Sequence, residues 1–399
     1  METKEDTMKK TSAVDLSLIE ELTQQTQDEI KKMKPIHILV VGKTGVGKST
    51  LINRVFRERL VETGIGEPIT KHLRQITKDN LPLVLYDTRG LELDAAIQDQ
   101  VAREINECLD QLEAKGETMH CAYYCINASS SRIEPMEKDF IQGLAEKMPV
   151  ILVLTQAIGQ PAQDFKKYLE NLNLKVQAVV PIMAKDYPVS PDYTVEAYGL
   201  DHLIEQTLAV IPHDVQDAFN NAQQGDLDRK ARLARRWARR YIISTFGVGF
   251  TPIPFADAAL IVPLQISMLA HITAIFGVSL EHQTLVGLIG AVGGTTGATF
   301  LGRTLVGNIF KLIPGLGSLA GGAISGATAS IVTTALAMSY ISVLRVIAEH
   351  DVRNEKLSAK SIRKLMQSEF RARLRRGKKD PDYQAIRNEQ EKEKKERKD

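Results

Sequence analysis

Cysteine and tryptophan are scarce in this chain of 399 residues, which contains three cysteines and one tryptophan. Cys121 and Cys125 lie four residues apart in an apolar run, and in a strand their Cα atoms would be roughly 13 Å apart. A disulfide requires Cα atoms within about 7 Å. The pattern therefore excludes a disulfide framework and indicates a reducing cytoplasm. The N-terminal residues METKED lack an apolar core, so we expect no secretory signal there.

Neither sign of charge dominates the whole chain, whose formal net charge is +2, but the two halves differ. Residues 1–227 contain 24 Lys and Arg against 35 Asp and Glu, a net charge of −11. Residues 228–399 contain 27 against 14, a net charge of +13. We therefore expect the basic half to contact an anionic partner, either a lipid surface or RNA. The length predicts two domains with tails.

A glycine-rich segment, GKTGVGKS at 42–49, follows the apolar run IHILVV at 36–41 and precedes an amphipathic helical pattern. A strand, a loop and a helix in this order form a cradle for phosphates, because backbone amides and the helix N-terminus point at the anion. Lys48 would reach the β- and γ-phosphates, and the Ser49 hydroxyl would ligate Mg²⁺. The expected nucleotide-binding loop comprises Gly42, Lys43, Thr44, Gly45, Val46, Gly47, Lys48, Ser49 and Thr50.

Five apolar runs alternate with helical stretches in the first half of the chain, at 36–41, 81–87, 121–127, 149–155 and 176–184. Buried parallel strands have this composition, so the alternation predicts an α/β fold with a doubly wound, mostly parallel sheet. Asp87 ends the second run. Its carboxylate would therefore lie at the carboxyl edge of the sheet, where ligands bind in such folds and where a hard cation finds oxygen ligands.

The loop GKTGVGKS, followed by Thr70 and by Asp87-Thr88-Arg89-Gly90, resembles an Era-like GTPase. The form of the loop is most similar to septin-like and immunity-related GTPases. The resemblance implies GTP and GDP as ligands, Mg²⁺ as cofactor, an Asp87 contact to the metal through water, a Gly90 amide on the γ-phosphate, and Thr70 closing over the metal. Thr63 remains an alternative to Thr70. The expected catalytic residues are Lys48, Thr70 and Gly90, and the expected metal ligands are Ser49, Thr70 and Asp87.

Two departures from the family pattern affect the expected activity. Leu91 stands where many small GTPases have a water-orienting glutamine. A leucine cannot orient water by hydrogen bonding, so we expect slow hydrolysis of GTP to GDP and phosphate unless a homodimer across the GTPase domains completes the site. The segment Thr155-Gln156-Ala157-Ile158 lacks the Asp that normally pairs with guanine.

The second base-side element is closer to the family pattern, because Met183-Ala184-Lys185 resembles the usual Ser-Ala-Lys loop. The residues expected to line the base are Thr155, Gln156, Ala184 and Lys185. GTP is favoured on this resemblance, while ATP or relaxed specificity stays open.

The second half begins with a basic segment and continues with long apolar stretches. The basic residues surround Trp237 and are Arg229, Lys230, Arg232, Arg235, Arg236, Arg239 and Arg240. Residues 255–278 and 316–344 are apolar and reach the ~20 residues that span a bilayer. The composition favours membrane association through residues 229–345, with a tightly packed soluble helical domain as the alternative. The segments at 249–265 and 300–317 resemble a bacterial domain of unknown function.

We therefore expect an N-terminal helix at 1–34, a P-loop GTPase domain at 35–213, a basic linker helix at 214–240, an all-α hydrophobic, Gly-rich domain at 241–348, and a charged, partly disordered tail at 349–399. The leading hypothesis is a slow GTP-hydrolysing switch coupled to a membrane-associated helical domain. The alternative is a soluble Era-like assembly factor whose basic half binds RNA or the ribosome. A gated pore is a third and weaker hypothesis.

Overall fold

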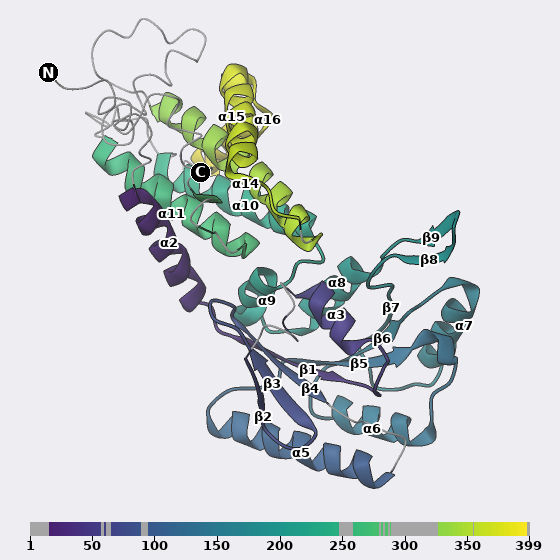
Figure 1. Cartoon of the computed structure of the whole chain (residues 1–399). Coiled ribbons are helices and arrows are strands. Elements are labelled where there is room, and N and C mark those ends of the chain that lie inside the picture. Colours follow the sequence, from purple (N-terminus) through teal and green to yellow (C-terminus); the bar gives the residue numbers. More distant parts are fainter. Residues whose placement is uncertain are drawn as a thin grey trace, which may run out of the picture. The chain divides into compact units, whose positions relative to one another are not determined.

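The computed structural model describes residues 16–56, 60, 65–88, 95–246, 258–278, 281, 284, 285, 288, 326–353 and 355–396. The chain divides into two compact units, drawn in Figure 1. One unit is an α/β unit formed by Ile30–Asp226, and the other is a helical unit formed by Leu227–Asp399 together with the N-terminal segment up to Glu29.

The α/β unit is built on a seven-stranded sheet with the strand order β2-β3-β4-β1-β5-β6-β7. Strands β4, β1, β5, β6 and β7 are parallel, and β2 and β3 extend one edge in antiparallel pairing. The mostly parallel sheet expected from the apolar runs is confirmed, while the antiparallel edge was not predicted. The strands are β1 (Ile36–Val41), β2 (Ile65–Pro68), β3 (Leu73–Thr77), β4 (Leu83–Thr88), β5 (Cys121–Asn127), β6 (Val150–Thr155) and β7 (Ala178–Pro181).

Helices cover both faces of this sheet, as the doubly wound pattern predicts (Figure 1). Along β1, Ile36, Ile38 and Val40 face one hydrophobic cluster, while Leu39 and Val41 face the other. Side chains alternate between faces along a strand, so both faces of a buried strand must be apolar. The first cluster includes α3 (Lys48–Val55), α8 (Leu200–Val210) and α9 (Gln216–Ala222), and the second includes α5 (Ala95–Ala114), α6 (Pro135–Ala145) and α7 (Gly159–Glu170).

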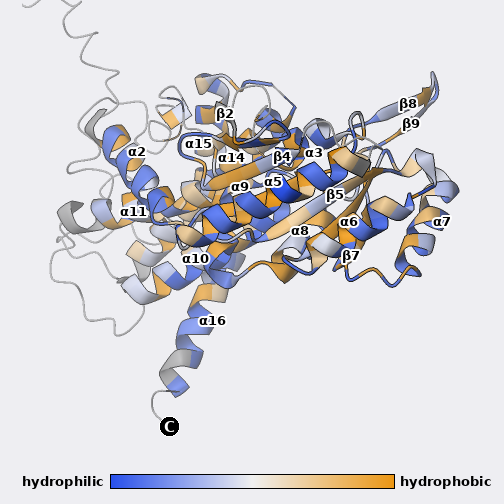
Figure 2. Cartoon of the chain, turned by 90° about the horizontal axis from the view of Figure 1, so that it is seen from below, coloured by the Kyte–Doolittle hydropathy of each residue, from blue (hydrophilic) through white to orange (hydrophobic). Residues whose placement is uncertain are grey.

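Smaller elements complete the α/β unit. A hairpin of β8 (Tyr187–Ser190) and β9 (Tyr193–Val195) follows β7, and short 3₁₀ turns occur at η1 (Ala128–Ser130) and η2 (His213–Val215). Figure 2 shows α5 with alternating hydrophilic and hydrophobic colours along its length. This alternation is typical of a helix that places one face on a sheet and the other in solvent.

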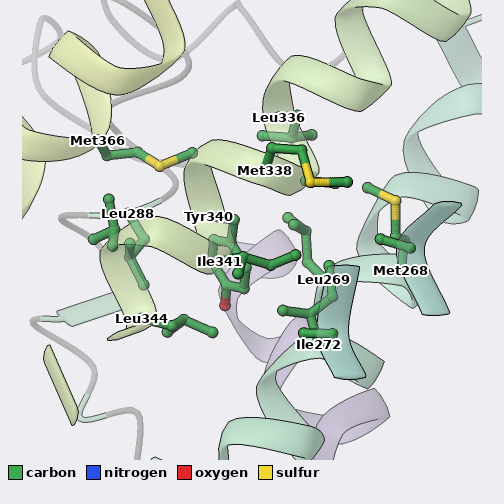
Figure 3. Packing of buried hydrophobic residues seen from close by; sticks show 14 of the residues in the cluster. Met268, Leu269, Ile272, Leu288, Leu336, Met338, Tyr340, Ile341, Leu344 and Met366 are labelled. Carbon is green, nitrogen blue, oxygen red and sulfur yellow. The ribbon is translucent and has the colours of Figure 1, made fainter. Parts of the chain in front are cut away.

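The helical unit is organised around α14 (Gly326–Val352). Figure 3 shows Tyr340, Ile341 and Leu344 of this helix packed among Leu269 and Ile272 of α11. The remaining helices of the unit are α2 (Leu16–Lys31), α10 (Leu227–Phe246), α11 (Ala258–Phe276), α15 (Ala359–Arg376), η4 (Gly377–Lys379) and α16 (Pro381–Glu396). The expected helical second half is confirmed, although the Gly-rich stretch at 289–325 lies outside the described residues.

The basic segment that we expected as one linker helix at 214–240 is divided between the two units. Residues of η2 and α9 pack on the sheet through Val215 and Phe219, and α10 begins the helical unit at Leu227. The aromatic residue of the segment is used in packing, because the Trp237 ring stacks on His271 with 3.9 Å between centroids. Lys230 is buried, and its Nζ donates to the Phe276 carbonyl at 2.6 Å.

The charged C-terminal segment forms two helices where partial disorder was expected. Leu374 of α15 and Ile386 of α16 are buried in the core of the helical unit. The Asp382 carboxylate at the start of α16 accepts hydrogen bonds from Arg239 of α10 at 2.7 Å and from Arg373 of α15 at 3.0 Å. These contacts outweigh burial and lower the pKa of Asp382. Apolar residues at helical spacing, rather than overall composition, account for the order of this segment.

Two buried histidines join β1 to the segment that precedes β5. His120 Nδ1 accepts a hydrogen bond from the His37 backbone N–H at 2.9 Å, and the His120 N–H donates to the His37 carbonyl at 3.0 Å. Burial lowers the pKa of His37 and lowers the pKa of His120 to about 4. Both rings are therefore neutral in the folded chain at pH 7, and Nδ1 of His120 must be unprotonated to accept its bond.

This pair predicts acid sensitivity of the α/β unit. Between pH 6.5 and 4 the unfolded chain binds a proton at residue 120 that the folded chain does not, so stability falls as pH falls through this window. The loss is up to about 3 kcal/mol for His120. We expect His120→Asn to remove this part of the pH dependence of the unfolding free energy, because Asn does not titrate. The Asn Oδ1 can still accept the hydrogen bond from the His37 N–H.

Urea unfolding at several pH values, followed by reaction of Cys108, Cys121 and Cys125 with a disulfide reagent active in acid, measures this effect. All three cysteines are buried in the α/β unit, so their reactivity reports its unfolding. His202→Asn, at an exposed position on α8, is the control. If the unfolding free energy of His120→Asn depended on pH as that of the unaltered chain does, His120 would not be the source of the acid sensitivity.

Candidate nucleotide site

The glycine-rich loop connects β1 to α3 at the carboxyl edge of the parallel strands. The register pairs Val40 with Asp87 of β4 and Val41 with Tyr124 of β5, so the loop emerges between these two neighbours. Strands β4, β6 and β7 are parallel to β1 and end at the same edge, so the candidate residues that follow them lie there too. Ligands of open α/β sheets bind at this edge.

At two positions of the loop, the backbone conformation favours glycine over residues with a side chain. Gly42 has φ +149°, and a Cβ there would lie 2.5 Å from the Cys125 carbonyl oxygen of β5. Gly47 has φ +96° and is the N-cap of α3, so the first turn of α3 begins without a capping side chain. The amides of that turn, at Lys48, Ser49 and Thr50, are the groups that a helix N-terminus presents to an anion.

Lys48 folds back along the loop. Its Nζ donates to the carbonyl oxygens of Gly42 at 2.7 Å and Lys43 at 3.0 Å. Burial lowers the pKa of Lys48, and the nearby Asp87 carboxylate opposes that effect. Asp87 is itself buried at the end of β4. The expected phosphate-binding cation and the expected metal-binding carboxylate are therefore close enough to interact.

The oxygen groups at this edge fit a hard cation such as Mg²⁺. Asp87 offers a carboxylate from β4, and Ser49 offers a hydroxyl from the first turn of α3. Within the described part of the chain, no group of three His, Cys, Asp or Glu side chains could hold a metal ion. A cation here would therefore take its other ligands from phosphate oxygens and water, as Mg²⁺ commonly does.

Thr70, the third expected metal ligand, lies in the turn between β2 and β3. The register pairs Leu73 with Thr88, so this turn lies beyond the carboxyl end of β4, at the same sheet edge as Asp87. The Thr70 hydroxyl donates a hydrogen bond to the Glu104 carboxylate of α5 and accepts one from the Leu73 N–H at 3.0 Å. Gly90 and the alternative Thr63 lie outside the described residues, as does Leu91.

On the base side, Thr155 ties the phosphate loop to the sheet. Its Oγ1 lies 2.5 Å from the Val46 carbonyl and 3.2 Å from the Ile126 carbonyl. A hydroxyl has one proton, so Thr155 donates to one of these carbonyls at a time. The next residue, Gln156, has φ +51° and is exposed. Thr155 is therefore a loop-positioning residue, and Gln156 stands at the edge of the site.

Two residues that the sequence did not single out hold the second base-side loop. Arg54 of α3 donates from Nε to the Ala184 carbonyl at 2.7 Å. Tyr198 exchanges backbone hydrogen bonds with Met183 at 3.1 and 3.0 Å, and its hydroxyl donates to the Ala157 carbonyl at 2.8 Å. Tyr198 thus joins the two base-side loops. Lys185 is exposed beside Ala184.

A third unpredicted residue, Glu137 of α6, anchors the phosphate loop from the other side. Its buried carboxylate pairs with Lys43 Nζ at 2.8 Å and accepts a hydrogen bond from the Tyr124 hydroxyl at 3.3 Å. Lys43 is 94 residues from Glu137 in sequence. Glu137 also accepts a hydrogen bond from the Glu134 backbone N–H at 3.1 Å at the start of α6, and no sequence motif pointed to its contact with Lys43.

Comparison with known families agrees with this geometry. The family model described as "50S ribosome-binding GTPase" matches residues 37–156, which run from β1 to the first base-side loop. Residues 37–156 belong to a P-loop GTPase domain. A second model, "Domain of unknown function (DUF697)", matches residues 213–371. The resemblance inferred from the sequence is confirmed for both halves.

Curated relatives of this GTPase-containing chain include human septins. Septin-9 is 22% identical over 211 residues, covering 46% of this chain and 35% of the septin. Septin-4 is 26% identical over 175 residues, covering 36% of each. The chain therefore spans about a third of the length of the curated relatives it matches.

Solved structures similar to the GTPase domain include a GTP-binding protein and an RNA-bound Era. A probable GTP-binding protein engB has a TM-score of 0.32 and 20% identity, covering 44% of this chain and 97% of that protein. Era in complex with MgGDPNP and nucleotides of 16S ribosomal RNA has a TM-score of 0.31 and 20% identity, covering 45% of this chain and 58% of that one.

The close approach at Gly42 yields a testable consequence for the GTPase domain. We expect Gly42→Ala to destabilise it by about 2–4 kcal/mol, because the new Cβ would clash with the backbone of β5 and the residue would keep an unfavourable φ. Gly143 is exposed in the middle of α6 and has open space around it. Gly143→Ala should therefore stabilise the domain by about 0.5–1 kcal/mol. Urea unfolding followed by cysteine reactivity measures both, and equal effects would contradict the role of Gly42.

Proposed function

We propose that this chain binds GTP with Mg²⁺ at the loop of residues 42–50, hydrolyses GTP slowly, and acts as a switch coupled to its helical unit. The observation that carries the proposal is the convergence of the glycine-rich loop, half-buried Lys48 and buried Asp87 at one sheet edge. The family match of residues 37–156 supports the same chemistry.

The chain's own residues would divide the work as follows. The first-turn amides of α3 and the Lys48 ammonium bind and neutralise phosphate oxygens, and phosphoryl transfer depends mainly on such positioning and charge stabilisation. Ser49 and Asp87 would hold Mg²⁺, which neutralises charge on the β- and γ-phosphates when bound. Binding would require Lys48 to exchange its bonds to the Gly42 and Lys43 carbonyls for bonds to phosphate.

GTP is the proposed nucleotide because one of the two base-side loops is held in a position to read a base oxygen. The Ala184 loop is held in place by Arg54 and by Tyr198, so the Ala184 amide can serve as a fixed donor to a base oxygen. The other base-side segment has Ile158 where a carboxylate would normally read guanine. A missing bidentate contact reduces discrimination by about 1–3 kcal/mol, so we propose preference for GTP over ATP that is weaker than usual.

Slow hydrolysis and dimerisation form one proposal. Leu91 cannot orient an attacking water, so an isolated chain would rely on positioning alone. A second copy that supplies the missing group across the nucleotide would raise the rate. The turnover rate per chain should then increase with chain concentration, whereas a constant rate would contradict dimeric completion.

Calorimetric titration with GTP, GDP and ATP in the presence of Mg²⁺ tests the site directly. We expect Lys48→Ala to weaken GTP binding by about 100-fold, because hydrogen bonds between charged groups, here a half-buried ammonium and phosphate, contribute up to about 3 kcal/mol. Lys175→Ala, at an exposed loop position, should bind as the unaltered chain does. Unchanged GTP affinity in Lys48→Ala would remove this lysine from the site, and binding of no purine nucleotide by the unaltered chain would refute the proposal.

Membrane association is the second part of the proposed function. Among the described helices, one segment, Ala329–Val352, is long and apolar enough to cross a membrane, with 24 residues and a mean hydropathy of 1.8. Most of it, 78%, is buried inside the helical unit. Core helices of soluble proteins meet the same criteria. We therefore propose reversible contact with anionic lipid through the exposed residues Arg232, Arg236 and Arg240 along one face of α10.

Vesicle flotation with anionic and neutral lipids measures this contact. We expect binding to anionic vesicles that falls at high salt, and a loss of at least about tenfold when Arg232, Arg236 and Arg240 are replaced by Gln. The matched control replaces Lys166, Lys167 and Lys175 of the GTPase domain by Gln. If the chain bound no vesicles but retarded RNA in a gel in a salt-sensitive manner, the RNA-binding alternative would be favoured instead.

A further inference from the structure

The Glu104 carboxylate of α5 holds the turn that carries Thr70. One oxygen accepts hydrogen bonds from the Thr70 hydroxyl and from the His72 backbone N–H at 3.0 Å. The other oxygen lies 3.0 Å from His72 Nδ1 and accepts a hydrogen bond from Gln100 Nε2 at 3.1 Å. A carboxylate can accept about four such bonds. Glu104 is therefore fully engaged, and three of its contacts go to the two turn residues.

Burial and hydrogen bonding have opposite effects on this carboxyl. Glu104 is 7% exposed. Burial raises its pKa, but the hydrogen bonds from Thr70 and His72 outweigh burial and leave the pKa below its ordinary value. Glu104 is thus an anion at neutral pH, and hydrogen bonds to an ionised acceptor are stronger than those between neutral groups.

The polar groups of Thr70 are also committed within the turn. Its N–H donates to the Leu73 carbonyl at 3.2 Å, and its hydroxyl oxygen accepts the Leu73 N–H at 3.0 Å. The hydroxyl proton goes to Glu104. Any contact of the Thr70 amide with a γ-phosphate would require opening of this turn. The Glu104 bonds oppose that opening, because they would break together.

We propose that Glu104 is a positioning residue that restrains Thr70 and so sets how strongly the chain prefers a nucleoside triphosphate over a diphosphate. This inference rests on the proposed nucleotide site. Mg²⁺ with a γ-phosphate and the Glu104 carboxylate compete for the turn of Thr70. A diphosphate lacks the γ-phosphate, so its binding leaves this turn closed. Weakening the restraint should therefore favour the triphosphate selectively.

The experiment compares the unaltered chain with Glu104→Gln and Glu104→Ala in Mg²⁺-dependent titrations of a non-hydrolysable GTP analogue and of GDP. We expect both variants to bind the analogue about tenfold more tightly, which corresponds to about 1.4 kcal/mol, with GDP affinity changed less than twofold. Glu107→Ala, at an exposed position one turn further along α5, is the matched control and should change neither affinity.

A second variant separates restraint from general damage to the fold. In a Thr70→Val background the hydroxyl that Glu104 holds is absent, so the additional effect of Glu104→Ala on analogue affinity should fall to less than threefold. Hydrogen exchange of residues 69–77 in the absence of nucleotide should be faster in Glu104→Ala, while exchange in β1 and β5 stays unchanged. Faster exchange throughout the sheet would show loss of folding, and Glu104→Gln would then decide the test.

The outcomes distinguish the two proposals. Normal GDP binding with unchanged analogue affinity in both Glu104 variants would overturn the restraint and leave the nucleotide site standing. Weaker analogue binding would also overturn it, because Glu104 would then hold Thr70 in its binding position. An unaltered chain that binds neither nucleotide would refute the proposed function, and the role of Glu104 with it.

Discussion

The close passage of the glycine-rich loop beside β5 is the constraint on which the rest of the candidate nucleotide site depends. Gly42 approaches the Cys125 carbonyl so closely that no side chain fits, and Thr155 on β6 contacts the Val46 carbonyl further along the loop. These contacts fix the direction in which α3 begins. The first-turn amides and Lys48 consequently face the edge where Asp87 ends β4. A parallel sheet supplies this arrangement because its strands all end at one edge.

Around that loop, two buried carboxylates connect the site to helices that cover the sheet. Glu137 of α6 holds Lys43, and Glu104 of α5 holds the turn of Thr70. Both carboxylates are buried, and both act on segments expected to meet phosphate or metal. Removing one partner of a buried charged pair leaves the other uncompensated. Glu104 and Glu137 therefore position the Thr70 hydroxyl and the Lys43 ammonium, beyond their effect on net charge.

The sequence predicted the parts of this structure that depend on local pattern. Lys48, Ser49 and Asp87 follow from a motif and from the end of an apolar strand, and the parallel strands follow from their composition. Arg54, Tyr198 and Glu104 could not be found in this way, because their partners lie 130, 41 and 34 residues away in sequence. The short antiparallel edge was also missed, since β2 has four residues and no apolar alternation.

The helical unit shows why an amphipathic basic segment is ambiguous from sequence. In α10 the small residues Ala231, Ala234 and Ala238 form the buried face, and Trp237 stacks on His271, so the aromatic residue serves packing. The same spacing of aromatic and basic residues is typical of a membrane interface. Composition cannot separate the two cases, because lipid and a protein core both accept apolar surface.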